Sequence, residues 1–279
     1  MENGRRKMGD GRRLNIILLL PSTILPIYTL CTLHLALCTL IILSASFASE
    51  DSKAQTIAPI IASMTDTEGW ASGDWRFDIR LNERSLGSYD IKIAHEETGY
   101  NISMQSKITS DNEITEITSS GEMTTNLGFR RYERTENRKG KSGKPKITSS
   151  AQLDGKIIKV KSQQDGDVAE AKEIEVNSET YAGIPALFAF LKIADLTKPQ
   201  DFAFQMFNAE GLNIVEVKLQ ITGGTKKVKS GDRDLDTYIV KATIGSNEMD
   251  FYLTEDNEIV QFGVPDFPLI FQRSETDLK

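Results

Sequence analysis

Beyond residue 48 the chain contains no cysteine, because Cys31 and Cys38 both lie in a long apolar segment near the N-terminus. Residues 49–279 therefore form no disulfide, no thiolate metal site and no thiol nucleophile. Histidine is nearly absent as well, since His95 is the only one in that part of the chain. One histidine without cysteine supplies too few ligands for the usual zinc sites. We predict that the chain binds no metal and no cofactor.

Catalytic motifs are equally scarce. His95 stands beside Glu96 and could form a catalytic pair with it, but no G-x-S-x-G serine accompanies them, and we interpret His95 as an exposed histidine at a strand end next to a turn. Asp232, Asp234 and Asp236 alternate, yet an EF-hand loop starting at Asp232 needs a glycine at its sixth position and a glutamate at its twelfth, and both are threonines. A glycosidase-type carboxylate pair stays open, although no two acids stand out. We assign no catalytic residue.

The N-terminal 48 residues resemble an export signal. Arg5 and four further basic residues precede residues 14–48, which contain no Asp, Glu, Lys or Arg. The segment ends with small residues at Ser46 and Ala48, as a signal peptidase requires. A secretory apolar core is typically ~7–15 residues long, whereas ~20 span a bilayer. Residues 1–48 are therefore a cleaved signal peptide or an uncleaved membrane anchor. In both cases we expect an exported, periplasmic protein of the cell envelope.

The exported part is acidic. Removing the five basic and two acidic residues of the first 48 from the 33 and 40 of the whole chain leaves 28 and 38, a formal net charge of −10. This balance argues against general nucleic-acid binding and is typical of a soluble surface.

The rest of the chain is organised by alternation. We expect a linker over 49–69, a single β-rich domain over 70–273, and a tail over 274–279. The domain opens with Trp75, Phe77, Ile79 and Leu81 on one face of a strand and charged residues between them. Similar runs recur about a dozen times with short connections, which favours antiparallel pairing. Glycines 223 and 224 are expected to break one long strand.

One segment departs from this alternation. Within residues 181–196, Ile184, Leu187, Phe188 and Leu191 follow the i, i+3, i+4, i+7 spacing of a single helix face. The predicted fold class is therefore mainly β, an antiparallel meander forming a roll, an open barrel or a β-clam with one short central helix.

The apolar helix face and the first strand suggest a binding site. An apolar pocket between helix and sheet would be lined by six residues, which we take as the candidate ligand-binding set: Ile184, Leu187, Phe188, Leu191, Trp75 and Phe77. The alternative is an ordinary packed core, which needs no ligand to explain these side chains.

Residues 130–146 carry eight Lys or Arg against two Glu, in an otherwise acidic domain. Such a loop can contact an anionic surface, for example lipid head groups or a polyanionic glycan. The candidates for this contact are Arg138, Lys139, Lys141, Lys144 and Lys146. The alternative is a flexible hairpin tip kept soluble by its charge, because no aromatic residue lies between 138 and 146 to add stacking.

Several motifs resemble a known family. They are G-D-W-x-F-x-I at 73–79, the apolar helix at 183–192, the strand at 235–241, F-Y-L-T-x-D at 251–256 and the following Pro265. Together they are similar to the domain of unknown function 3108 group of bacterial envelope proteins, over about 70–273. The Asp-Pro that precedes the helix in that pattern is replaced by Gly183-Ile184-Pro185. The resemblance implies a β-rich roll and an envelope location, and it transfers no catalytic residue.

Three functions remain open from the sequence. The first is a non-catalytic periplasmic or envelope protein that holds a lipid or another apolar ligand between helix and sheet. The second is a structural or assembly partner whose strand edges pair with another envelope protein. The third is an envelope hydrolase that uses paired carboxylates.

Overall fold

The computed structural model describes residues 54–64, 67–110, 113–140, 146–165, 167, 169–176 and 179–273. The predicted signal or anchor (1–48) and the predicted tail (274–279) lie outside these residues. Within the described part, no helix has both the length and the apolar character needed to cross a bilayer.

The described strands form one continuous sheet of fifteen strands, which confirms the predicted mainly β class. Its neighbours run in the order β8 to β1 and then β15 to β9, so that both halves are meanders joined where β1 pairs with β15. All pairs are antiparallel except β9 with β10. The strands are β1 (Gly73–Leu81), β2 (Arg84–Glu96), β3 (Gly99–Ser110), β4 (Glu113–Met123), β5 (Phe129–Gly140), β6 (Ile147–Asp154), β7 (Ile157–Gln164), β8 (Glu170–Glu175), β9 (Thr180–Tyr181), β10 (Gln200–Asn208), β11 (Asn213–Ser230), β12 (Arg233–Ile244), β13 (Asn247–Leu253), β14 (Ile259–Gly263) and β15 (Leu269–Arg273).

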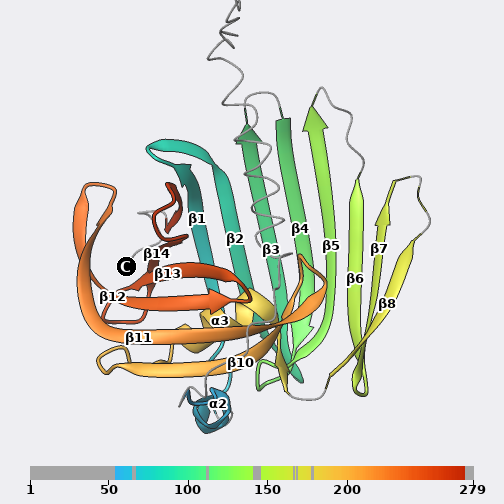
Figure 1. Ribbon diagram of the computed structural model, residues 1–279, viewed down its shortest axis with the longest axis horizontal. Helices are drawn as coiled ribbons and strands as arrows, with labels where there is room; N and C mark the ends of the chain where they lie inside the picture. The colour runs from blue at the N-terminus through green and yellow to red at the C-terminus, as the bar shows by residue number, and fades with distance from the viewer. Residues whose placement is uncertain are drawn as a thin grey trace, which may run out of the picture.

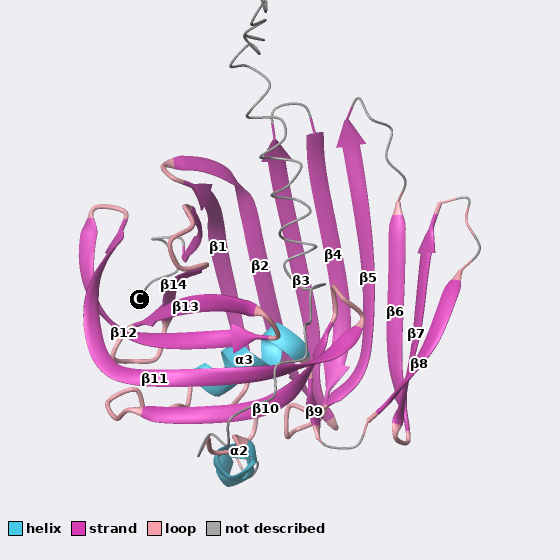
Figure 2. Cartoon of the chain, viewed as in Figure 1, coloured by secondary structure: helices cyan, strands magenta, loops and turns pink. Residues whose placement is uncertain are grey.

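The sheet folds over on itself into two layers. Strands β1 to β8 stand upright in Figure 1, and β10 to β13 cross in front of β1 to β5 with the helix α3 (Gly183–Leu191) between. Figure 2 shows how little of the domain is helical: the second described helix is α2 (Ala58–Met64), at one end of the molecule. The fold is thus an open, clam-like barrel.

The free end of the second layer returns to the start of β5. Gly128 forms an isolated antiparallel bridge with Tyr181, and the amide of Ala182 donates to the carbonyl of Leu127 at 2.9 Å. This contact is short and leaves the sheet open, so that β6, β7 and β8 extend the first layer beyond it.

Helix α3 begins where the sequence predicts. Gly183 has φ +68°, and a Cβ there would lie 2.8 Å from the carbonyl oxygen of Phe207, so the position requires glycine. The spacing predicts one buried face, but the helix is buried on nearly all sides, including Ala186, Ala189 and Phe190. The reason is that two layers enclose it, and a helix that is apolar all round is typical of such a position.

Phe188 ties the helix to both layers. Its ring meets those of Trp75 and Phe77 in the first layer edge-on, with centroids 5.7 and 5.9 Å apart. Phe251 and Phe262 of the second layer meet it edge-on at 6.1 and 5.6 Å. Such aromatic pairs stabilise beyond the area they bury, by about 0.5–1.5 kcal/mol each.

Residues 54–64, which we expect in a linker, pack against the domain instead. Gln55 pairs with β10, donating to Asp201 and accepting from Ala203 at 2.8 Å each. Ile57 and Ile61, one helical turn apart, are fully buried in the core. The apolar residues of this segment therefore belong to α2 and the residue before it, and they pack against the core of the domain.

The predicted break at Gly223 does not end its strand. Strand β11 continues to Ser230 through a register shift after Ile221, where Gly223 takes φ +65°. A bulge of this kind bends a strand without ending it. The bend brings the β11–β12 hairpin back over the second layer, where Val228 packs with Tyr252 and Val260.

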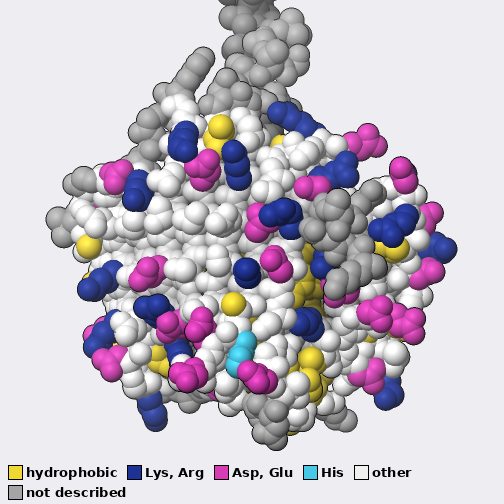
Figure 3. Space-filling model, turned by 180° about the vertical axis from the view of Figure 1, so that it is seen from behind, with side chains coloured by type: hydrophobic (Ala, Val, Ile, Leu, Met, Phe, Trp, Pro, Cys, Tyr) yellow, Lys and Arg dark blue, Asp and Glu magenta, His cyan; other side chains and the backbone are white. Residues whose placement is uncertain are grey.

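The outer face of the first layer is polar. Seen from behind, it carries interspersed acidic and basic side chains with few hydrophobic ones (Figure 3). Arg76 and Asp90, for example, pair across β1 and β2 at 2.6 Å. The apolar residues of these strands therefore face the space between the layers.

Candidate functional site: an apolar cavity with a charged mouth

The space between the layers is partly hollow. A cavity of about 220 Å³ lies there. Its wall combines side chains of the first layer, of the second layer and of the N-terminal turn of α3. They include Ile102, Met104, Ile117, Phe129, Tyr132, Ile184, Pro185, Phe188, Met206, Phe207, Ile244, Met249, Phe251, Phe262 and Phe271.

The cavity extends from the first turns of α3 along β3. Ile102, Met104 and Ser106 of β3 line it. Ile102 is buried, whereas Met104 and Ser106 are half-buried.

Two of the six predicted ligand-binding residues line this cavity. They are Ile184 and Phe188, on the first turns of α3. Leu187, Leu191, Trp75 and Phe77 are buried in the core but do not line the cavity.

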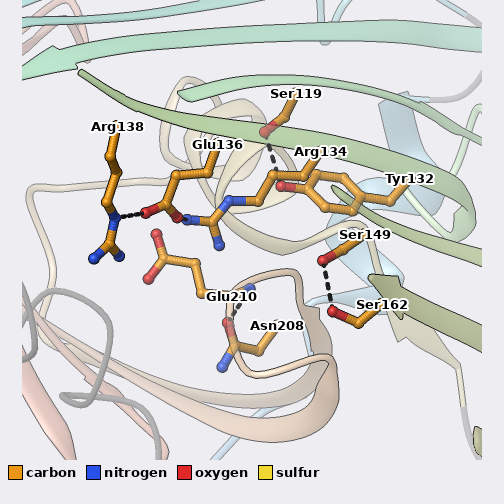
Figure 4. Close-up of polar contacts among 9 residues, drawn as sticks. All are labelled: Ser119, Tyr132, Arg134, Glu136, Arg138, Ser149, Ser162, Asn208 and Glu210. Carbon is orange, nitrogen blue, oxygen red and sulfur yellow. Dashed lines mark hydrogen bonds and ion pairs between the residues drawn. The ribbon is translucent and has the colours of Figure 1, made fainter. Parts of the chain in front are cut away.

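A row of charged side chains stands on the inner face of β5. The two oxygens of Glu136 each accept a hydrogen bond from an arginine: Oε2 from Arg134 at 2.8 Å, and Oε1 from Arg138 at 2.5 Å (Figure 4). The Glu136 side chain is only 4% exposed, and those of Arg134 and Arg138 are 11% and 19% exposed. Arg134 also lines the cavity. The row thus places two guanidinium groups around one carboxylate beside an apolar space.

Glu210 approaches this row from the other layer. It lies in the β10–β11 turn, lines the cavity, and directs its carboxylate towards the β5 row (Figure 4). Its amide donates to Asn208 Oδ1 at 3.1 Å, which fixes the turn. Glu210 as a residue is exposed to solvent, while its carboxyl group is partly desolvated by the protein around it. Burial raises the pKa of its carboxyl, Arg134 opposes this shift, and the charge of Glu136 adds to it.

Two tyrosines add neutral polar groups to the wall. Tyr132 donates to Ser119 Oγ at 2.8 Å, and burial raises the pKa of its hydroxyl to about 12. The hydroxyl of Tyr89 donates to Met104 Sδ at 3.7 Å, and burial raises the pKa of this hydroxyl as well. Both hydroxyls are therefore neutral near pH 7.

The residues of the predicted basic surface do not share one face, because neighbouring residues of β5 point to opposite sides of the sheet. Arg138 faces inward in the row, whereas Lys139, the next residue, pairs with Glu116 at 2.7 Å. The main-chain amide of Lys146 donates to Asp165 at 2.9 Å. Lys141 and Lys144 lie outside the described residues.

His95 does not pair with its neighbour Glu96. Its Nδ1 lies 3.6 Å from Glu68, while Glu96 accepts from Asn101 at 2.8 Å. Among the described residues no group of three or more His, Asp or Glu is arranged to hold a metal ion.

Comparison with known proteins gives a fold neighbour and no family. No family model matches the chain, and no curated protein matches it. A crystal structure of a β-barrel-like protein of domain of unknown function DUF1849 from Brucella abortus is similar over 72% of this chain and 94% of that chain. Its identity is 10% and its TM-score 0.48. The resemblance to domain of unknown function 3108 remains a prediction.

Proposed function

We propose that this protein is a non-catalytic binding protein that holds an apolar ligand, such as the acyl chain of a lipid, in the cavity between its two layers. The observation that carries the proposal is the cavity itself, which is walled mostly by apolar side chains from both layers and from the first turns of α3. Sites for apolar ligands are concave and lined in this way, with a few polar groups that orient the ligand.

The packing around the cavity supports this proposal. Phe190 and Phe202 are fully buried, their rings meet edge-on with centroids 5.2 Å apart, and neither lines the cavity, so the domain does fill its core elsewhere. By contrast, Met104, Ile117 and Met249 face the interior and remain half-buried. Each Å² of apolar surface that stays in contact with water costs the fold roughly 25 cal/mol of hydrophobic stabilisation. A ligand that covers them recovers this free energy, and methionines adapt readily to its shape.

The N-terminal segment sets the compartment that we propose. An export signal or anchor over 1–48 would place the domain in the periplasm or on the envelope, where lipids are abundant. Ligand uptake from a membrane fits this location.

A hydrolase is less well supported. The carboxylates of Glu136 and Glu210 are directed towards one another and interact electrostatically (Figure 4). However, each oxygen of Glu136 already accepts a hydrogen bond from an arginine, which leaves it poorly placed to act as a nucleophile or base. Pairing through a strand edge is also disfavoured, because β8, the last strand of its side of the sheet, exposes Glu170, Lys172 and Glu173.

The proposal is tested by blocking the cavity. Ile117 of β4 lines it, and its neighbour Thr118 is exposed on the other face of the same strand. We expect the purified protein to bind the apolar dye phenylnaphthylamine with a rise in fluorescence. Ile117→Trp should weaken this binding by about tenfold or more, and the control Thr118→Trp should leave it unchanged. Equal dye binding by wild type and Ile117→Trp would refute cavity binding.

A further inference from the structure

We propose that the ligand is an anionic amphiphile, whose carboxylate or phosphate head group binds at the Arg134–Glu136–Arg138 row while its chain occupies the cavity. This inference rests on the proposed function, because it assigns the head group of the molecule that the cavity holds.

The charge of the row depends on Glu210. Arg134, Glu136 and Arg138 together carry a formal charge of +1, and an ionised Glu210 brings the sum of the four groups to zero. Ion pairs enclosed by protein are costly to desolvate, and hydrophobic residues of similar size often stabilise a fold as well or better. A charged row beside a mostly apolar cavity is therefore better explained by recognition than by stability.

The polarity of β5 follows the shape of an amphiphile. Along its inner face the residues change from Phe129 and Tyr132, next to the apolar wall, to Arg134, Glu136 and Arg138. Inward-facing side chains are spaced about 7 Å apart along a strand. The inner face of β5 therefore changes from apolar to charged over a short distance. A ligand with an acyl chain and a charged end matches this order.

The neighbouring strands supply hydroxyl groups at the same level. Arg134 lies opposite Ser119 on β4 and Ser149 on β6. Ser149 Oγ is 3.4 Å from Ser162 Oγ on β7 (Figure 4). Serine hydroxyls and guanidinium groups together are the donors that bind carboxylate and phosphate oxygens.

Glu210 acts as the internal competitor of such a head group. It is an acid that reaches the row from the opposite layer, on a turn at the cavity mouth, and its charged form is disfavoured there. An anionic head group can take its place beside the row, with Glu210 protonated or turned outward.

Four ligands of equal chain length separate the alternatives: dodecanoate, dodecyl phosphate, dodecanol and dodecyltrimethylammonium, each displacing the dye from the purified protein. We expect the two anions to bind about tenfold more tightly than dodecanol, and the cation to bind more weakly. The tighter of the two anions identifies the head group as carboxylate or phosphate.

Variants assign the preference to the row. Arg134→Gln should remove the preference for the anions and leave dodecanol binding in place. Lys139→Gln, on the opposite face of the same strand, is the matched control and should change nothing. Glu210→Gln should strengthen binding of the anions by several-fold without affecting dodecanol, and it tests the inference even if Arg134→Gln fails to fold.

The two proposals fail in different ways. Equal binding of dodecanoate, dodecyl phosphate and dodecanol by the wild type would overturn the head-group site and leave cavity binding intact. Binding of none of the four would overturn the proposed function itself.

Discussion

The side-chain amide of Asn257 lies 3.1 Å from the main-chain carbonyl oxygen of Leu191, the last residue of α3, and donates a hydrogen bond to it. The same amide donates to the carbonyl of Ala194 at 2.8 Å. Asn257 belongs to the turn between β13 and β14, so this turn satisfies carbonyls that the end of a helix leaves without partners. The cap holds the C-terminal end of α3 against this turn, and the first turns of the same helix line the cavity.

Removing this cap should destabilise the domain. Asn257 has φ +60°, which glycine tolerates, so Asn257→Gly removes the two hydrogen bonds without adding strain. We expect a loss of about 1–3 kcal/mol in the free energy of unfolding, measured by urea denaturation. Asp266→Gly is the control, because Asp266 also has positive φ, lies in the next turn and caps no helix. The two variants should differ; equal stability would show that the cap contributes nothing.

A second prediction concerns Gly87 in β2. Its φ is +155°, and a Cβ there would lie 1.7 Å from the carbonyl oxygen of Lys107 on β3. Gly87→Ala should therefore force the two strands apart and cost about 4 kcal/mol or more, among the largest effects of single substitutions. Gly155→Ala provides the comparison: Gly155 has φ +62° with no atom within 4 Å of the added Cβ. It should cost only ~1–2 kcal/mol of backbone strain. Similar denaturation midpoints for both would contradict the clash.

Alkaline pH should destabilise the domain through its buried tyrosines. The pKa of Tyr132 is raised from 10.0 to about 12, so the folded protein retains a proton that the unfolded chain releases between these values. Stability from this group is fully present below pH 10 and is lost as the pH rises towards 12. Tyr132→Phe should flatten the fall in melting temperature over this range, at the loss of about 0.5–1.5 kcal/mol for the hydrogen bond to Ser119 at neutral pH. Parallel curves for the two proteins would contradict the assignment.

The sequence predicts the layers of this fold better than its interior. Alternation identifies Ile102 and Met104 as inward-facing on the same strand, and both do face inward. It cannot show that both line a cavity, or that Ile102 is buried and Met104 only half-buried, because both positions require an apolar side chain. Whether the space is filled depends on how the two layers cross, and that is a property of the tertiary structure.

The inward orientation of the Arg134–Glu136–Arg138 row could be predicted from the sequence, whereas its proximity to Glu210 could not. Tyr132 is apolar in character, and side chains two residues apart share a face, so an inward Tyr132 predicts that Arg134, Glu136 and Arg138 also face inward. The eight basic residues of 130–146 look like one charged loop unless this alternation along β5 is taken into account. Glu210 lies on the opposite layer, some seventy positions away along the chain, and only the folding-over of the sheet brings it to the row.

The pH dependence of stability should report on Glu210 directly. Its pKa is raised in the folded protein by burial and by Glu136, so the fold favours the protonated acid. The stability that it contributes is present below about pH 4.5, the ordinary pKa of the carboxyl, and is lost as the pH rises through the raised value. Gln cannot ionise and suffers no such loss. Because the side chain is accessible, the effect is screened, and we expect Glu210→Gln to melt roughly 1–2 °C above wild type at pH 7–8.

Below pH 4.5 the protonated glutamic acid resembles glutamine, so the two melting temperatures should converge. The difference between the proteins at each pH cancels the titration of other groups. A difference that stays constant with pH would show that Glu210 keeps an ordinary pKa, and a lower melting temperature of Glu210→Gln at pH 7–8 would show that its carboxylate stabilises the β5 row. In that second case Glu210 would be an integral partner of Arg134, and an anionic head group could not displace it. The same variant therefore decides whether the mouth of the cavity is a closed ion-pair network or a site that exchanges its own carboxylate for that of a ligand.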